Sequence, residues 1–600
     1  MLDTFRQPPP PLTRRQNQIV IATSILVAVT RFIARTRSAW DWDEFLFQLG
    51  VREYDVTQHH PHPPGYPIFI AAAKFVRLFT QSDFHALQIV VLIGALLLFP
   101  VVFFFARELR FDFRTSLFGA LIASFLPNIW YYGGTAFSDI PGVVSGLLAC
   151  VLILRGCRDA RAYVAGAFLL GLSAGIRPQN LMTALLPALI ATIIRIRISW
   201  KSVVIGALAG AIAVAGCYAG AALASKSADE YVYIVKMQQK WVHDIDSFHN
   251  PQREPLTQVA RRVFLWPCGA RREFIAMFIL AVISLVDSIF RRRVSPLLAL
   301  LTFLPFALFT WFMLSYEAIP RYAIGYIVAN ALLAADGIAA IARFAVLQSV
   351  LSLVLVFELG AWTWPAIRMM HRTLSPPVNA MRYIREHAKP HQSTIFVHTG
   401  LHPFSDHDLA DYAPVEYQND KELPEAGSRL PAYILTPEGG LYQGGETFSI
   451  PRNSHLWDIV RRRNFETTVL PAYRRIRFGA GWYEPEGEGF DVWRWMGAEA
   501  RMTLPPLPGR GKFAIHFLVP LDLEAKPPTL EVRVNGAVIE HSLCTSEEQR
   551  REWVIPSLPD RANDVVLSVS DAPVPAALHR GTDGRALGLE LRDFSWAPVP

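Results

Sequence analysis

The sequence predicts a bundle of membrane-spanning helices, followed by a small soluble α/β module and a β-sandwich. The 600 residues are 52% hydrophobic and only 18% charged, which is too apolar for an ordinary soluble protein. The long apolar windows all lie before about residue 367. The last part consists of short alternating runs between turn residues, a pattern typical of a sandwich. We therefore expect a membrane domain at 1–375, an α/β module at 376–474 and a β-sandwich at 475–600.

Charge and cysteine content narrow the class of protein. The formal net charge is +7, but the basic residues gather in short runs between apolar segments. Membrane topology produces this distribution, so we expect no nucleic-acid partner. The five cysteines have neither a pairing-like spacing nor a CxxC motif, so the sequence predicts no disulfide framework and no cysteine metal site.

The apolar windows give the expected helices. A membrane helix needs about 20 mostly apolar residues, and about eleven candidates meet or approach this length. They lie near 18–36, 86–106, 115–132, 140–155, 162–177, 179–195, 202–223, 273–290, 295–315, 321–343 and 345–366. No small-residue cleavage site follows the first window, so we expect it to be a retained helix rather than a signal peptide.

The basic loops predict the orientation in the membrane. If Arg14 and Arg15 are cytoplasmic, alternation also places the basic loops 107–114, 155–161, 195–201 and 290–293 on the cytoplasmic side, as the positive-inside rule requires. The opposite side then receives the loop 38–85, Asp139, Arg177, the loop 224–272, Arg321 and the soluble part. We therefore expect a multi-pass protein of the inner (plasma) membrane, with a cytoplasmic N-terminus and a periplasmic soluble domain.

The soluble part begins where Pro376 and Pro377 stop the last helix. Strand-like and helix-like runs alternate up to about residue 474, and short β-type runs follow, with an Asn-Gly hairpin turn at 535–536. The stretch HTGLHPFSDHDLADY is rich in metal-ligand residue types. A loop after a strand is normally polar, so this composition favours an ordinary loop over a metal site.

Three carboxylates follow the first apolar window directly. Asp41, Asp43 and Glu44 stand in the motif DWDE, and acids at the mouth of a membrane helix indicate function because their partial dehydration is costly. Two of them could hold a divalent cation, or one could act as a general base. The alternative is a helix end whose acids only face water.

The same loop continues with HHPHPPGYP, which contains His59, His60 and His62. The prolines keep the chain extended and no metal-type spacing accompanies the histidines, so a hydrogen bond to a substrate phosphate or hydroxyl is favoured over metal ligation.

Further on, Asp139 precedes Ile-Pro. This acid either caps the following helix or takes part in a metal site.

Two arginines are expected at the outer membrane edge, where the positive-inside rule disfavours them. Arg177 stands in GIRPQN and Arg321 in IPRYAIGY. Such an arginine either extends its charged end to the membrane interface or binds an anion. Its planar guanidinium group can form two parallel hydrogen bonds to a phosphate. Two of them on the side of the acids favour a phosphate-bearing lipid substrate.

Together, DWDE, HPHPPGYP, GIRPQ and PRYAIGY resemble the C-type membrane glycosyltransferases, over residues 15–370. The nearest relatives are the dolichyl-phosphate-mannose-type protein mannosyltransferases and the bacterial aminoarabinose transferases. The resemblance implies a C-type fold and an inverting enzyme. This enzyme would move one sugar, a hexose or a pentose, from a polyprenyl-phosphate donor to a hydroxyl of a glycan, lipid or protein acceptor on the outer face.

The resemblance also implies roles for individual residues. Asp43 becomes the catalytic base, with Asp41 or Glu44 as its partner, and Asp43 with Asp139 would hold a divalent cation, Mg²⁺ or Mn²⁺, if the enzyme uses one. The expected substrate contacts are His59, His60, His62, Tyr66, Arg177, Arg321 and Tyr322. The family's usual motif is Asp-Glu, whereas DWDE offers three acids, so the choice among them stays open.

Two other classes of protein remain as alternatives. A transporter or flippase of a lipid-linked or sugar substrate would also place charges inside a helical bundle, but should show paired repeats and helices broken at mid-membrane. A glycan-binding envelope protein would use the sandwich for binding and the helices as an anchor. It would leave the DWDE loop unexplained.

Overall fold

The computed structural model divides the chain into two compact units. One comprises Met1–Leu374 and Arg452–Arg461, and the other Ser375–Pro451 and Arg462–Pro600. The described residues are 2–418, 423, 432–437, 445–451, 454–460, 465–471, 476–488, 491–507, 509–523, 526–580 and 582–599. The expected boundary at 474/475 lies outside these residues, so the three-part division stays a prediction.

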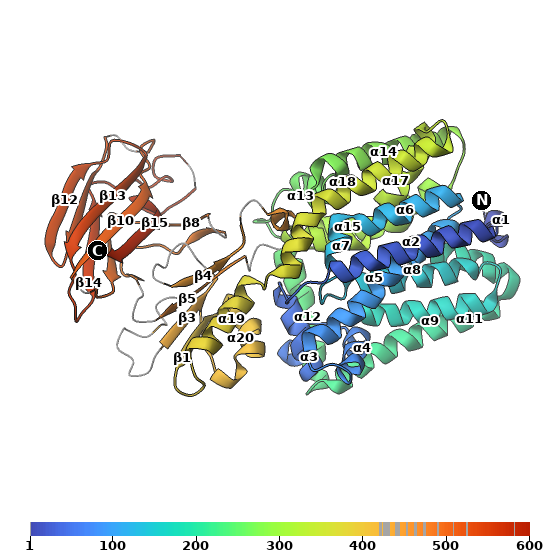
Figure 1. The fold of residues 1–600 in the computed structure, drawn as a ribbon, viewed down its shortest axis with the longest axis horizontal. Coiled ribbons are helices and arrows are strands. Elements are labelled where there is room, and N and C mark those ends of the chain that lie inside the picture. The colour runs from blue at the N-terminus through green and yellow to red at the C-terminus, as the bar shows by residue number, and fades with distance from the viewer. Residues whose placement is uncertain are drawn as a thin grey trace. The chain divides into compact units, whose positions relative to one another are not determined.

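The first unit is helical (Figure 1). Its α-helices are α1 (Leu2–Arg6), α2 (Arg14–Ile33), α3 (Trp42–Arg52), α4 (Pro67–Arg77), α5 (Asp83–Glu108), α6 (Phe113–Phe125), α7 (Pro127–Tyr132), α8 (Asp139–Arg155), α9 (Ala160–Ile176), α10 (Asn180–Thr183), α11 (Leu185–Ala224), α12 (Ala228–Trp241), α13 (Leu256–Phe264), α14 (Arg271–Phe290), α15 (Ser295–Met313), α16 (Ile319–Tyr322), α17 (Val328–Ile341) and α18 (Ala345–Arg372). Short turns are η1 (Val56–Gln58), the π-type η2 (Val242–Asp246), η3 (Tyr316–Ala318), η4 (Ala323–Gly325) and η8 (His455–Asp458).

Helix α5 lies at the centre of this unit. It packs against α2, α4, α6 and α8, and the packing continues from α8 through α9 to α11 and from α6 through α17 to α14. Most of α5 is buried, whereas α2 and α11 keep apolar side chains such as Ile25, Leu26 and Ile212 exposed. An apolar helix surface of this kind suits contact with lipid.

Among the described residues, six helices are long and apolar enough to cross a membrane, or seven if the bent pair Tyr316–Gly325 and Val328–Ile341 forms one span. The six are α2, α5, α11, α14, α15 and the stretch that starts with α18. A helical membrane-like region followed by a β-rich part is thus present, but the count of about eleven spans is not confirmed.

Local breaks account for the difference. The expected spans 179–195 and 202–223 merge into α11, in which Ser199 has non-helical dihedral angles. The expected span 115–132 divides at Pro127, whose preceding residue Leu126 has an extended ψ of 135°, as the ring of a following proline favours. Helices α8 and α9 have 17 residues each, which is short for a full crossing.

Two of the basic loops, 107–114 and 155–161, meet the N-terminal segment at one end of the helices. Glu108, at the end of α5, pairs with Arg155 at 3.1 Å and Arg158 at 2.8 Å, and Arg107 donates to the carbonyl of Pro10 at 3.0 Å. Because α8 starts at Asp139 and ends at Arg155, this basic end lies about 24 Å along the helix axis from Asp139. Which end faces the cytoplasm stays a prediction.

The second unit contains an α/β part and a β part. The α/β part consists of α19 (Pro376–His387), β1 (Thr394–His398), η5 (Thr399–Leu401), α20 (His402–Asp408), η6 (Ala410–Tyr412), β2 (Val415–Tyr417), β3 (Ala432–Thr436), β4 (Glu446–Ser449) and β5 (Glu466–Pro471). Its sheet has the order β2-β1-β3-β5-β4, with β1 parallel to both neighbours.

The β part consists of β6 (Arg477–Phe478), β7 (Glu486–Glu488), β8 (Asp491–Met496), β9 (Glu499–Leu504), β10 (Arg510–Leu518), β11 (Thr529–Val534), β12 (Ala537–Leu543), β13 (Glu548–Pro556), β14 (Asn563–Val569) and β15 (Leu589–Pro598). They form two antiparallel sheets of five strands, β13-β10-β15-β8-β7 and β12-β11-β14-β9-β6. Phe513 and Phe594 of one sheet share a buried core with Met502 and Val532 of the other, which is the packing of a β-sandwich.

Candidate active site

The three acids of DWDE lie at the N-terminal end of α3, and two of them build its cap. Oδ1 of Asp41 accepts the backbone N–H of Asp43 at 3.1 Å. Oε2 of Glu44 accepts the backbone N–H groups of Trp40 at 2.6 Å and Asp41 at 3.2 Å. This reciprocal pattern is a capping box, which satisfies backbone donors that a helix start leaves without partners.

Glu44 also ties the first loop to the turn before α8. Its Oε1 accepts the backbone N–H of Ala136 at 2.8 Å, and its side chain is fully buried. Burial raises the pKa of Glu44 to about 7, although the N–H groups of Trp40 and Ala136 oppose the shift. The carboxyl group therefore holds α3 beside the turn that leads into Asp139.

Asp43 starts a chain of alternating charges. Its Oδ2 lies 2.5 Å from a terminal guanidinium nitrogen (Nη1) of Arg321. Nε of Arg321 lies 3.3 Å from Oδ2 of Asp139, and Oδ1 of Asp139 lies 3.0 Å from Nη2 of Arg177. In this chain, Arg321 lies between two carboxylates, those of Asp43 and Asp139. Asp139 in turn lies between two guanidinium groups, those of Arg321 and Arg177.

Asp43 is the exposed end of this charge chain. Its side chain is 25% exposed, against 3% for Asp139, 5% for Arg177 and 8% for Arg321. Asp139 is the first residue of α8 and Arg177 is the C-cap of α9. A negative charge at a helix N-terminus and a positive charge at a C-terminus are both favoured by the helix dipole. An incoming reactant would reach Asp43 first.

Aromatic rings and a backbone contact position Arg321. Its guanidinium carbon lies 4.5 Å from the ring centre of Phe137 and 5.7 Å from that of Tyr322, distances that suit cation–π attraction. Asn128 donates to the carbonyl of Pro320 at 2.8 Å, which fixes the segment carrying Arg321. The predicted contact residue Tyr322 therefore lies beside the charge chain.

His62 and Tyr66 lie within the electrostatic reach of the charge chain. Nε2 of His62 and the hydroxyl of Tyr66 are 3.0 Å apart. Burial lowers the pKa of His62 to about 4, with Arg321 lowering it further and Asp43 opposing the shift. Burial also raises the pKa of Tyr66 to about 12. Both side chains are therefore uncharged near neutral pH and can serve as polar contacts.

His59 and His60 belong to a turn beside Asp55. The backbone N–H of Asp55 donates to the carbonyl of His60 at 2.8 Å, and the N–H of His60 donates back at 2.9 Å. His59 has a left-handed φ of 60°. The structure thus brings Asp43, Asp139, Arg177 and Arg321 into one chain, with His62 and Tyr66 nearby, while the backbone of His59 and His60 shapes the turn.

The expected cation ligands Asp43 and Asp139 both contact Arg321. The guanidinium takes the place between them that a divalent cation would occupy, so this geometry does not support the pair as a metal site. Among the described residues, three donors that could hold a metal come together at His402, Asp406 and Glu416, in the second unit.

Phe137 and the capping box were missed at the sequence level, although both have a signal. Asp-x-x-Glu before an apolar run is a sequence signature of a capping box, and DWDE followed by FLFQL fits it. Phe137 precedes Ser138 and Asp139 directly. Only the fold shows that its ring lies against Arg321.

A known family model matches the part of the chain that contains the motifs PHPPGYP and GIRPQ. Residues 61–221 match the family model described as dolichyl-phosphate-mannose-protein mannosyltransferase. The matched segment contains Asp139 and Arg177 and ends before Arg321. It confirms the resemblance to the C-type membrane glycosyltransferases. Comparison with curated protein sequences gives no match.

Solved structures of this class resemble the chain distantly. ArnT from Cupriavidus metallidurans bound to undecaprenyl phosphate is 11% identical with a TM-score of 0.46, over 76% of this chain and 98% of that chain. Arabinofuranosyltransferase AftD from Mycobacteria is 10% identical with a TM-score of 0.41, over 98% and 62% of the two chains. Arabinosyltransferase EmbB from Mycobacterium smegmatis is 12% identical with a TM-score of 0.37, over 99% and 66%.

The cap around Glu44 leads to a prediction about stability. In Glu44→Gln, the amide NH₂ must face a backbone N–H at Trp40, Asp41 or Ala136. A buried donor left without a partner costs about 1–3 kcal/mol. We expect a lower midpoint of thermal unfolding in detergent, while the exposed control Glu230→Gln leaves it unchanged. An unchanged midpoint with lost activity would instead assign Glu44 to catalysis.

A second prediction concerns His62. Its folded-state pKa of about 4 lies below the ordinary value of about 6.5, so between these pH values the unfolded chain binds a proton that the folded chain does not. Stability is then lost as the pH falls through this window. We expect the stability advantage of wild type over His62→Gln to shrink by roughly 1–2 kcal/mol between about pH 7.5 and pH 5. The exposed His85→Gln serves as control, and a pH-independent difference would contradict the assignment.

Proposed function

We propose that the chain is an integral-membrane inverting glycosyltransferase. It moves one hexose or pentose from a polyprenyl-phosphate donor to a hydroxyl of a glycan, lipid or protein acceptor on the outer face. The observation that carries this proposal is the charge chain of Asp43, Arg321, Asp139 and Arg177, which joins an exposed carboxylate to two buried guanidinium groups. The family match over 61–221 supports the same class.

The arginines suit a lipid-linked phosphate. A polyprenyl donor diffuses in the plane of the membrane, so its phosphate has to be bound at the end of membrane helices. Arg177 ends α9, whose apolar run precedes it directly. A guanidinium group can form two parallel hydrogen bonds to a phosphate and stabilise the charge that develops when it leaves.

Asp43 suits the role of general base. In the proposed reaction, the acceptor oxygen attacks the anomeric carbon, the bond to the phosphate oxygen breaks on the opposite side, and Asp43 takes the hydroxyl proton. The donor phosphate competes with Asp43 for Arg321. Once the guanidinium turns toward the phosphate, the carboxylate loses its partner and becomes a stronger base.

The neutral pair of His62 and Tyr66 fits contacts to sugar or acceptor hydroxyls, because both groups can donate and accept hydrogen bonds. Asp41 and Glu44 then act indirectly by building the helix start that presents Asp43. His59 and His60 shape the turn before these residues. We assign no step to a divalent cation, since Arg321 supplies positive charge where the cation would lie.

The proposal includes an orientation. The basic end, where Glu108 binds Arg155 and Arg158, would face the cytoplasm with the N-terminus, following the positive-inside rule. The active-site end and the soluble domain would then face the periplasm. The membrane would be the inner (plasma) membrane.

Transport is the main alternative, and the position of the charges disfavours it. Asp139 lies about 24 Å along α8 from the basic end, close to the opposite end of the helices, whereas transporters place their substrate sites near the bilayer midplane. A glycan-binding envelope protein would have no use for a buried chain of four charges, because it needs the helices only as an anchor.

Asp43→Asn tests the proposed base. We expect transfer from undecaprenyl-phosphate-linked hexose and pentose donors in proteoliposomes to fall about 10²–10⁴-fold, the usual contribution of a general base. The amide still accepts a hydrogen bond from Arg321 and Asp139 still compensates its charge, so the variant should fold, with a lower unfolding midpoint than wild type. Asp229→Asn, an exposed acid on α12, is the matched control. Retained activity would remove Asp43 from the mechanism, and no transfer from any donor by wild type would favour the transporter.

Arg321→Lys tests the phosphate contact. Lysine keeps the positive charge but lacks the planar guanidinium group with its several N–H donors. It therefore cannot contact Asp139 and form two parallel hydrogen bonds to a phosphate at the same time. We expect the apparent affinity for undecaprenyl phosphate to fall about tenfold, or roughly 1.4 kcal/mol. Arg272→Lys, on a side chain that is 80% exposed, should bind like wild type. Equal affinity of all three proteins would contradict the assignment.

A further inference from the structure

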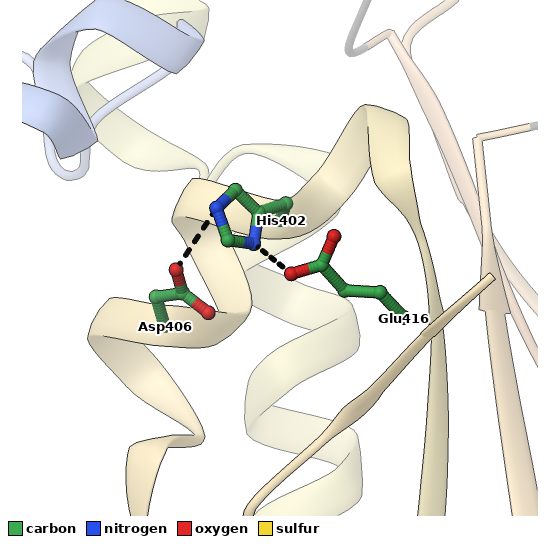
Figure 2. Close-up of side chains that lie close together, drawn as sticks. All are labelled: His402, Asp406 and Glu416. Atoms are coloured by element: carbon green, nitrogen blue, oxygen red, sulfur yellow. Dashed lines mark ion pairs between the residues drawn. The ribbon is translucent and has the colours of Figure 1, made fainter. Parts of the chain in front are cut away.

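A cluster of three metal-type ligands lies in the second unit, away from the charge chain in sequence. His402 is the first residue of α20, Asp406 follows one helical turn later, and Glu416 lies on β2. Figure 2 shows the His402 ring between the two carboxylates. Nδ1 of His402 is 2.6 Å from Oε1 of Glu416, and Nε2 is 3.2 Å from Oδ2 of Asp406.

We propose that His402, Asp406 and Glu416 form a zinc-binding site. One ligand atom from each side chain lies within 4.8 Å of the other two. Bonds of about 2.0–2.1 Å in a tetrahedron place neighbouring ligands about 3.3 Å apart. The two carboxylates contact different ring nitrogens of His402. One carboxylate would rotate toward the nitrogen that the other contacts, so that three ligand atoms surround one ion and water takes the remaining position.

The local sequence brings the three ligands together. Positions four apart on a helix share one face, which puts His402 and Asp406 side by side on α20. Strand β2 runs parallel to β1, and α20 follows β1 in the chain through η5. Glu416 thus approaches the helix from the neighbouring edge strand.

Charge and donor type favour zinc over other divalent ions. Two carboxylates face one imidazole, so bound Zn²⁺ would neutralise an excess of negative charge when His402 is neutral. An imidazole ligand suits Zn²⁺, whereas Ca²⁺ and Mg²⁺ prefer oxygen ligands alone.

A metal at this position would have a structural consequence. Strand β2 has only three residues, and among the described strands it pairs with β1 alone. A zinc ion would tie this edge strand to α20. Bound metal would therefore protect 402–417 from local opening, because a ligand that binds only the folded form stabilises it. This role is independent of sugar transfer.

Zinc titration of the purified full-length protein tests the site. After treatment with EDTA, we expect calorimetry to show one saturable Zn²⁺ site per chain, with no comparable binding of Ca²⁺ or Mg²⁺. His402→Ala and the isosteric Glu416→Gln should each weaken binding at least tenfold. Hydrogen exchange at 402–417 should slow on addition of zinc in wild type only.

His541→Ala is the matched control. His541 pairs with the single carboxylate of Glu531 at 3.1 Å on the sandwich, so it presents an exposed histidine–acid pair without a third ligand. This variant should bind zinc like wild type. No saturable zinc binding by wild type would overturn the proposal and leave His402 paired with Asp406 and Glu416 alone. Unchanged affinity in His402→Ala would also overturn it, by placing the zinc elsewhere.

Discussion

The burial of Arg321 is the constraint on which the active-site end of the bundle depends. A guanidinium group that is 8% exposed has lost most of its hydration, and removal of one partner from a buried ion pair costs about 3–5 kcal/mol. Arg321 is compensated by Asp43 on one side and Asp139 on the other. Positions 278 residues apart in the chain are thereby held together. The first loop, the start of α8 and the segment before α17 therefore form one unit of structure.

The backbone reinforces the same junction. Glu44 binds the N–H of Ala136, and Gln88 of α5 donates to the carbonyls of Thr36 at 2.9 Å and Gly134 at 2.8 Å. These contacts join the chain on both sides of the acidic motif to the turn before Asp139. Buried polar groups that are fully paired define a single arrangement, because any slip leaves a donor or acceptor without a partner. The loop that carries Asp43 is thus held in place by buried hydrogen bonds rather than by charge alone.

The sequence was sufficient for some features of the fold and insufficient for others. Many short β-type runs between turns and the Asn-Gly signal predicted the sandwich, and the hairpin of β11 and β12 turns at Asn535 and Gly536, both with positive φ. The ends of the helices were harder to predict, because hydropathy does not reveal local breaks such as the one at Ser199 within α11. At the site, the motifs identified Asp43, Arg177 and Arg321 as candidates, but their pairing depends on tertiary contacts. The metal-type cluster was not predicted, because the polar residues of HTGLHPFSDHDLADY were interpreted as an ordinary loop and the third ligand, Glu416, lies outside this stretch.

Helix dipoles distinguish Arg321 from the other three members of the charge chain. Asp43 lies in the first turn of α3, Asp139 begins α8, and Arg177 caps the C-terminus of α9. Each of these charges therefore has the sign that its helix end favours. Arg321 lies in α16, a helix of only four residues, which is too short to contribute a comparable dipole. Its position depends on its two carboxylate partners, the rings of Phe137 and Tyr322, and the hydrogen bond from Asn128 to Pro320. In the proposed reaction, Arg321 is therefore the arginine that a donor phosphate would draw to a new partner at the least cost to the helices around it.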